Sequence, residues 1–186
     1  MTHTNVFRQL MEDHRNLKKV LSVLEQEVAM YETETGDPET EPNLNLIMEI
    51  MDYIHYYPEF FHHPLEEAAF DYLLTQNKGD VDQINDIRGE HKELEKISAE
   101  LRETVNGISV GNPTPLTDLR EAVNDYVEAQ RRHIRKEETT VFKTIKPLNK
   151  ADCDVIMAQV EAHKDPVFAA NTEQEYDELM HAISDH

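Results

Sequence analysis

The sequence has 186 residues, a formal net charge of −20, five glycines, no tryptophan and a single cysteine, Cys153. One cysteine excludes an intramolecular disulfide and a thiolate-rich metal site, and the acidic charge argues against nucleic acid and anionic membranes as partners. No apolar run approaches the roughly 18 residues of a membrane span. The N-terminus lacks a signal-peptide pattern, so we expect a cytoplasmic protein whose composition favours helices.

The first predicted helix begins after Thr4 or Asn5, either of which can cap it, and ends before residues 36–38. Its apolar residues recur every three or four positions, which predicts one buried face. His14 fills the one step of this stripe that lacks an apolar residue, so its side chain is predicted to point at the core. The apolar positions are Phe7, Leu10, Leu17, Leu21, Leu24 and Val28.

The second predicted helix is capped by Asn43. Pro58 removes a backbone donor, so we expect the helix to kink or break there. Pro64 fits best in the first turn of a restarted helix. His62 and Glu66, four residues apart, would then straddle a helix start.

The third predicted helix starts at Asp80 and runs to about Val105, followed by a loop over residues 106–115. His91 interrupts its apolar stripe between Ile87 and Leu94. This position again predicts a histidine that faces the core.

The fourth predicted helix begins near residues 115–117 and is stopped by Pro147. His133 and Glu137 both lie on its inward stripe. We interpret residues 1–146 as a four-helix bundle. Residues 147–186 form a C-terminal helical extension packed on it, with a helix from Asn149 to about residue 164 and another over about 172–183.

Each of the four long helices therefore contributes an inward histidine. The pairs His62–Glu66 and His133–Glu137 repeat one spacing, which puts an imidazole and a carboxylate on one helix face. Burying two carboxylates and several imidazoles without a cation is very unfavourable, so a metal site is preferred over isolated core histidines or surface ion pairs. Nitrogen and oxygen donors without sulfur favour iron, then manganese, over zinc.

Two carboxylates that can bridge indicate two metal ions. Four histidines and two bridging glutamates leave the ions short of six ligands each. An oxo or hydroxo bridge would leave about two positions open to water, dioxygen or another small ligand.

These segments resemble the hemerythrin-like HHE cation-binding domains in order, spacing and helix placement over roughly residues 5–146. The resemblance implies an all-α, up-down four-helix bundle. It also implies a non-haem di-iron centre in which Glu66 and Glu137 bridge the ions. The segments that carry it are Glu12-Asp13-His14-Arg15, Phe61-His62-His63-Pro64-Leu65-Glu66-Glu67, Gly89-Glu90-His91-Lys92 and His133-Ile134-Arg135-Lys136-Glu137-Glu138.

The sequence departs from the oxygen-carrying members, which have His-x-x-x-His on the third helix, because Glu95 stands at the second position. One histidine is therefore missing. His63, next to His62, is our candidate for completing the metal shell, against a surface or outer role. Glu95, Glu67 and Glu138 are weaker candidates. The lower histidine count favours a centre that reacts with or senses oxygen, peroxide, nitric oxide or iron over reversible oxygen carriage.

Two alternatives remain open at this point. A ferritin-like di-iron oxidase or iron-handling protein would use Glu-x-x-His on two helices; the strings at 59–62 and 178–181 match, but we interpret both as coincidental. A helical interaction module without metal would use its acidic surface to bind a basic partner. Tyr176, Leu179 and Ile183 predict an amphipathic helix that docks on the bundle or on a second subunit, so a homodimer is one expectation.

Overall fold

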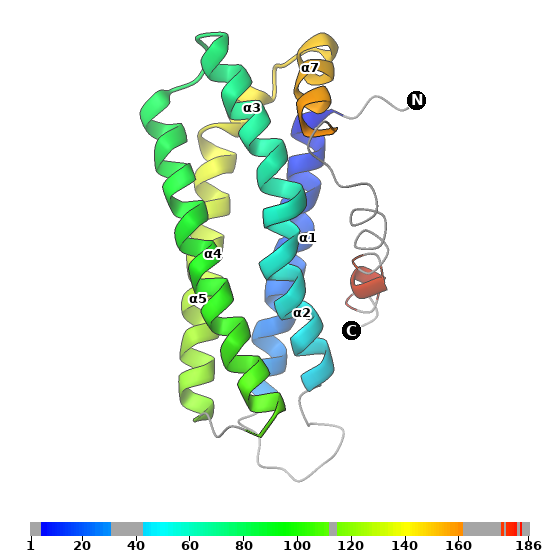
Figure 1. The fold of residues 1–186 in the computed structure, drawn as a ribbon, viewed down its shortest axis with the longest axis vertical. Coiled ribbons are helices and arrows are strands. Elements are labelled where there is room, and N and C mark those ends of the chain that lie inside the picture. The colour runs from blue at the N-terminus through cyan, green and yellow to red at the C-terminus, as the bar shows by residue number, and fades with distance from the viewer. Residues whose placement is uncertain are drawn as a thin grey trace.

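The computed structural model describes residues 5–30, 43–111, 115–161, 176, 178–181 and 183 (Figure 1). Its regular elements are all helices, which confirms the predicted all-α fold. The helices are α1 (Val6–Met30), α2 (Leu44–Tyr57), η2 (Pro58–His62), α3 (His63–Thr75), α4 (Val81–Ser109), α5 (Leu116–Thr139), α6 (Phe142–Ile145) and α7 (Lys150–Glu161).

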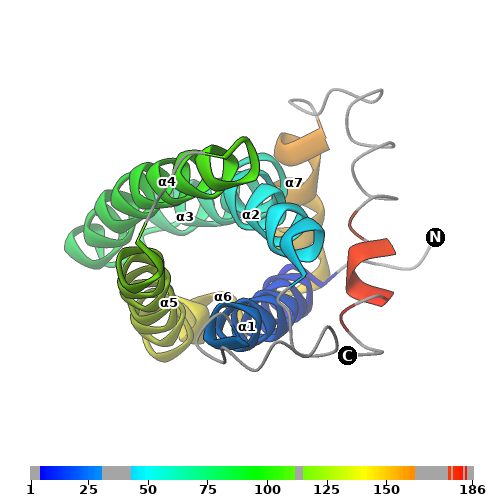
Figure 2. The same ribbon diagram turned by 90° about the horizontal axis from the view of Figure 1, so that it is seen from below.

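Four long helical runs form an antiparallel bundle, with α2, η2 and α3 making up the second run (Figure 1). Seen along the bundle axis, α1, the α2–α3 run, α4 and α5 follow one another around the bundle, and α5 returns to the side of α1 (Figure 2). Helix α7 packs on α3 and α1. The predicted division at residue 146 stays a prediction, and the predicted first loop and much of the last predicted helix lie outside the described residues.

Asparagine and aspartate side chains start four of the helices, as the sequence predicts, because their oxygens accept hydrogen bonds from first-turn backbone N–H groups. These caps fix where each helix enters the bundle. The bonds run to Asn5 from the N–H of Arg8 (3.1 Å), to Asn43 from Leu46 (3.1 Å), to Asp80 from Asp82 and Gln83 (3.0 and 3.1 Å), and to Asn149 from Asp152 (3.1 Å).

The chain stays helical through both prolines, so no break occurs at Pro58, whereas Pro64 does lie in the first turn of α3 as predicted. Pro58 has helical dihedral angles of −57° and −46°, and the N–H of His63 donates to the carbonyl of Pro58, five residues back. Pro58 and Pro64 cannot donate to the helix ladder. A single π-helical turn lies where these donors are lost, and such turns often occur at functional sites. His62 ends this turn and remains buried beside Glu66.

Two helix ends also differ from the predictions. Helix α5 ends at Thr139, well before Pro147, because Thr140 leaves helical geometry with φ −118° and ψ −91°. The chain then forms the separate short helix α6. Helix α4 continues to Ser109, beyond the predicted end at Val105, so the loop after it is shorter than expected.

Two apolar clusters fill the bundle on either side of a polar layer. One contains Leu24, Tyr53 and Tyr126, and the other contains Phe70 and Phe142, all buried. Along α1 and α4 the candidate metal ligands fall between residues of the two clusters. Within the described part of the chain, no helix is both long and apolar enough to cross a membrane.

Candidate metal centre

The polar layer brings together all seven residues that the sequence singled out, although they come from four helical runs. Glu66 and Glu137 are completely buried, and His14 is 1% exposed. Their positions are His14 on α1, His62 at the end of η2, His63 and Glu66 on α3, His91 on α4, and His133 and Glu137 on α5. That these residues bind metal stays a prediction.

The donor atoms of this layer fall into two groups. Within each group, the candidate ligand atoms all lie within 4.8 Å of one another. The first group contains His14, His62, Glu66 and Glu137, and the second contains His63, His91 and His133.

Glu66 belongs to the first group but also contacts the second. Its Oε1 is 3.3 Å from Nε2 of His62 in the first group, and its Oε2 is 3.3 Å from Nε2 of His91 in the second. The two oxygens of one carboxylate therefore point to different sets of histidines.

Glu137 has the same arrangement from the opposite side of the bundle. Its Oε2 is 3.2 Å from Nε2 of His14, and its Oε1 is 3.0 Å from Nε2 of His133. Two carboxylates that each present one oxygen to each group can bridge two cations.

The distances within the layer fit metal ligands better than hydrogen bonds. Nε2 of His14 lies 3.2 Å from both Nε2 of His62 and Oε2 of Glu137, and a single N–H cannot serve both neighbours. Around an octahedral ion with bonds of about 2.1 Å, neighbouring ligand atoms lie about 3.0 Å apart.

Both oxygens of Glu66 and Oε2 of Glu137 are buried and accept no hydrogen bond from the described residues. Buried charged oxygens without donors are strongly unfavourable unless a cation binds them. The donor set therefore fits a metal ion.

Three of the imidazoles have a carboxylate at Nδ1. A carboxylate only accepts, so Nδ1 must donate and Nε2 keeps the lone pair that a metal needs. Each ring is thereby held in the tautomer and orientation of a ligand. The pairs are His14 with Glu138 (3.2 Å), His62 with Asp13 (3.1 Å) and His133 with Glu90 (2.9 Å).

Sequence reasoning did not assign roles to Asp13 and Glu90, although both stand next to predicted ligands. Asp13 precedes His14 but contacts His62. Glu90 precedes His91 but contacts a histidine of α5. In both cases the sequence places an acidic residue directly before a predicted ligand. Its carboxylate then accepts a hydrogen bond from a histidine ligand on a neighbouring helix.

His63 lies in the second group, with its ring stacked on that of His91 at a centroid distance of 4.0 Å. Its Nδ1 is 3.6 Å from a carboxylate oxygen of Glu59. The weaker candidates lie elsewhere: Glu95 is exposed, and Glu67 accepts a hydrogen bond of 2.7 Å from Arg88. The structure thus favours His63 over these two for the missing donor.

A small pocket lies against His63, between the α2–η2 run, α4 and α5. Its volume of about 10 Å³ is close to the room that one water molecule needs. Gln130 lines this pocket with a buried Oε1 that has no hydrogen-bond partner among the described residues. Exposed Glu59 and Glu95 also line it, so the pocket reaches towards the surface from the second group.

Protons on the imidazoles balance the buried carboxylates where no metal is bound. Burial and the charge of Glu137 disfavour the carboxylate form of Glu66, but the His62 and His91 imidazoles outweigh both and lower the pKa of Glu66 to about 2. Burial disfavours protonation of His91, yet the two glutamates raise its pKa to about 9. A metal ion must displace such protons to bind.

Residues 5–145 match the family described as Hemerythrin HHE cation binding domain. The chain belongs to this hemerythrin family. All seven candidate ligands lie inside the matched range, and α7 lies outside it. No curated protein and no solved structure matches the chain. Membership of a cation-binding family agrees with a buried His/Glu cluster that could hold a metal ion.

Proposed function

We propose that this hemerythrin-family protein holds two non-haem iron ions, bridged by Glu66 and Glu137, and binds a small oxygen or nitrogen ligand there. The observation that carries the proposal is that each glutamate directs one oxygen to each histidine group. Iron suits nitrogen and oxygen donors without sulfur in a site with six-coordinate spacing. Manganese is the second choice for the same donors.

The two ions would have different numbers of donors. His63, His91 and His133 give the second position three imidazoles, whereas His14 and His62 give the first position two. Both positions would share the two carboxylates, and an oxo or hydroxo bridge would add one ligand to each. The second position would then have six ligands and the first would have five. Dioxygen, peroxide or nitric oxide would bind at the first position.

The surroundings of the first position favour a small ligand. The His14 ring stacks on Phe142 at a centroid distance of 4.9 Å, and Phe142 belongs to the adjacent apolar cluster. Apolar packing on this side of His14 excludes bulk water. When bound, a di-iron centre supplies redox chemistry towards such a ligand. The protein residues hold the ions, fix the imidazole tautomers and exclude water.

The two alternatives fit the structure less well. An interaction module without metal accounts for the net charge of −20 but not for the buried oxygens of Glu66 and Glu137 that accept no hydrogen bond from the described residues. In the ferritin-like string at 59–62, the Glu59 side chain is 46% exposed and points at His63 instead of into the cluster. No observation therefore favours a ferritin-like oxidase.

Ligand binding can be tested apart from metal binding. The protein is loaded with ferrous iron without air, and nitric oxide is then titrated while the visible spectrum is recorded. We expect new absorption bands that saturate at one nitric oxide per pair of irons, and no bands from the protein without iron. A control variant, Glu95→Gln, should behave like the wild type because Glu95 is exposed. An iron-loaded protein whose spectrum does not change on adding nitric oxide, azide or peroxide would contradict the proposed ligand binding but not the proposed metal site.

A further inference from the structure

The three carboxylates that accept from the imidazole Nδ1 atoms are not equivalent. Two of them are paired with lysines: Glu138 accepts from Nζ of Lys18 at 2.6 Å, and Glu90 accepts from Nζ of Lys136 at 2.6 Å. Both are also partly open to solvent, with side-chain exposures of 23% and 36%. Lysine charge and solvent both weaken the negative potential that these carboxylates apply to their histidines.

Asp13, which accepts from Nδ1 of His62, has a different environment. It is only 4% exposed. Its Oδ1 accepts from the hydroxyl of Tyr57 at 2.9 Å and from Nε2 of Gln9 at 2.9 Å, and both donors are neutral. Among the residues that the structure describes, the ion pairs of Asp13 involve His62 alone.

A carboxylate on the Nδ1–H of a ligating histidine makes the ligand more basic, and this effect is larger where no cation and little water oppose it. We propose that Asp13 is a positioning residue that makes His62 the most strongly electron-donating imidazole of the cluster, and that the hydroxyl of Tyr57 moderates this effect by holding part of the charge of Asp13. Asp13 thereby lowers the reduction potential of the ion at the His14 and His62 position, and Tyr57 limits how far it falls. This inference rests on the proposed di-iron site.

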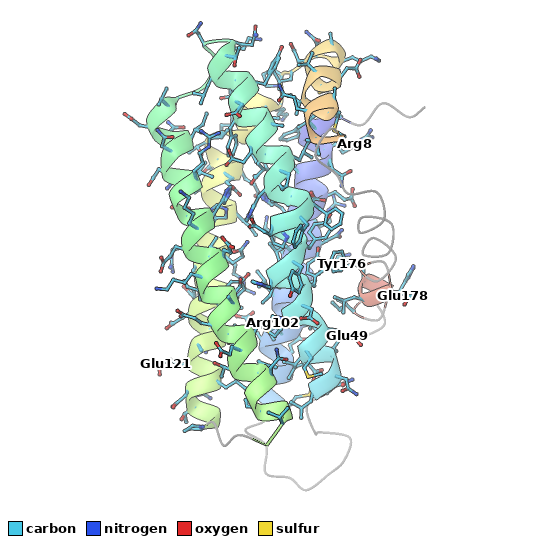
Figure 3. All side chains as sticks on the ribbon, viewed as in Figure 1. Arg8, Glu49, Arg102, Glu121, Tyr176 and Glu178 are labelled. Atoms are coloured by element: carbon cyan, nitrogen blue, oxygen red, sulfur yellow. The ribbon has the colours of Figure 1, made fainter. Side chains whose placement is uncertain are left out.

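The ring of Tyr57 is held in position by aromatic contacts that do not involve its hydroxyl group. Its ring stacks on Tyr53 at a centroid distance of 4.9 Å and on Phe61 at 5.4 Å. Tyr176, from the C-terminal segment, meets it edge-on at 5.2 Å. Figure 3 shows Tyr176 on the side of its segment that faces the bundle, whereas Glu178 points away. A phenylalanine at position 57 keeps these ring contacts and removes the hydrogen bond to Asp13.

The test compares Asp13→Asn and Tyr57→Phe with a matched control, Glu90→Gln, at the lysine-paired carboxylate. The midpoint potential and the iron dissociation constant are measured for each iron-loaded protein. Asp13→Asn should raise the potential and weaken iron binding about 10–100-fold, the usual effect of losing such a partner.

Tyr57→Phe should lower the potential, because Asp13 then concentrates its charge on His62. Glu90→Gln should move the potential less than Asp13→Asn. Opposite signs for the two variants distinguish tuning through His62 from simple structural damage, which would move both potentials the same way or neither.

Equal shifts for Asp13→Asn and Glu90→Gln, or shifts of one sign for Asp13→Asn and Tyr57→Phe, would overturn the inference and leave the di-iron proposal standing. Wild-type protein that binds no iron would overturn both. Should Asp13→Asn fail to fold by circular dichroism, Tyr57→Phe decides alone: a lower potential supports the inference, and an unchanged or higher one refutes it.

Discussion

The apolar layers and the polar layer of this bundle occupy the same four helices but are stabilised in different ways. Around Leu24, buried side chains release water on folding and need no partner beyond one another. Around Glu137, buried carboxylates lack hydrogen-bond donors at three oxygens and need positive charge. The comparison separates a scaffold that folds by packing from a centre that depends on a cation.

The largest expected effect comes from the apolar layer. Leu24 is completely buried and lies ten residues along α1 from His14. Leu24→Ala should lower the free energy of unfolding by about 2–5 kcal/mol, because it removes buried methyl groups and leaves a cavity. Chemical denaturation with and without iron measures this. The stabilisation that iron provides should be the same as in the wild type; a loss of iron would contradict the separation of the two layers.

The matching change in the polar layer is Glu137→Gln, which keeps the side-chain volume but loses the bridging charge. Iron content should fall below one ion per chain. The iron-dependent part of stability, about 3–4 kcal/mol at a hundred to a thousand times Kd, should disappear.

Glu128→Gln, at an exposed position of the same helix, is the control and should keep both ions. Elemental analysis and thermal melts read out the result. Full iron occupancy in Glu137→Gln would argue against bridging.

The pH dependence of the polar layer has a definite sign. The pKa of His91 is raised to about 9 by the two glutamates, so its stabilisation of the iron-free protein is present below its unfolded pKa and is lost as the pH rises to about 9. Iron binding instead displaces the proton from His91. Each displaced proton makes the free energy of iron binding more favourable by about 1.4 kcal/mol for each unit that the pH rises.

The rise in Tm on adding ferrous iron without air should therefore grow between pH 6.5 and 9. Melts at three pH values test this. An iron-induced rise in Tm that stays constant or becomes smaller between pH 6.5 and 9 would contradict this prediction.

His63 distinguishes the two metal positions. His63→Ala should weaken one ion selectively, because the second position keeps only two imidazoles, while the first position is unchanged. Stepwise iron titration followed by Mössbauer spectroscopy measures the two sites separately. Glu95→Gln is the matched control, because the sequence also made Glu95 a candidate for the missing ligand, and this variant should keep both ions. Loss of an ion in Glu95→Gln but not in His63→Ala would place Glu95, not His63, at the ion.

The smallest expected effect concerns neither layer. Gly89 lies inside α4, and a Cβ added there would meet no atom within 4 Å. Gly89→Ala should therefore raise the free energy of unfolding by about 0.5–1 kcal/mol without changing iron content. Denaturation curves test this, and a destabilised variant would show a role for Gly89 that its open surroundings do not indicate.

The inward histidines could be predicted because they interrupt regular apolar stripes. His14 and His91 each occupy a step where helical spacing requires a core residue, so sequence periodicity alone places them in the layer. Glu66 and Glu137 followed from a fixed spacing on one helix face. Local geometry was sufficient for these positions.

What the sequence could not predict depends on contacts between helices. Asp13 serves His62, which is far away in sequence, and only the packing of α1 against the second helical run shows this. The π-helical turn at Pro58 was missed because sequence rules treat an internal proline as a break. Thr140 likewise gave no strong stop signal, although the helix ends there. His63 was weighed as a ligand or a surface residue, and its place in the second donor group and its stacking on His91 favour the first role.

The most direct test of the central claim is the iron content per chain of aerobically purified protein, together with its ultraviolet–visible spectrum before and after dithionite and then air. The account predicts about two irons per chain and oxo-bridge charge-transfer bands that bleach on reduction and return in air. No iron after anaerobic reconstitution, with an unchanged Tm, would contradict it and favour an acidic helical interaction module.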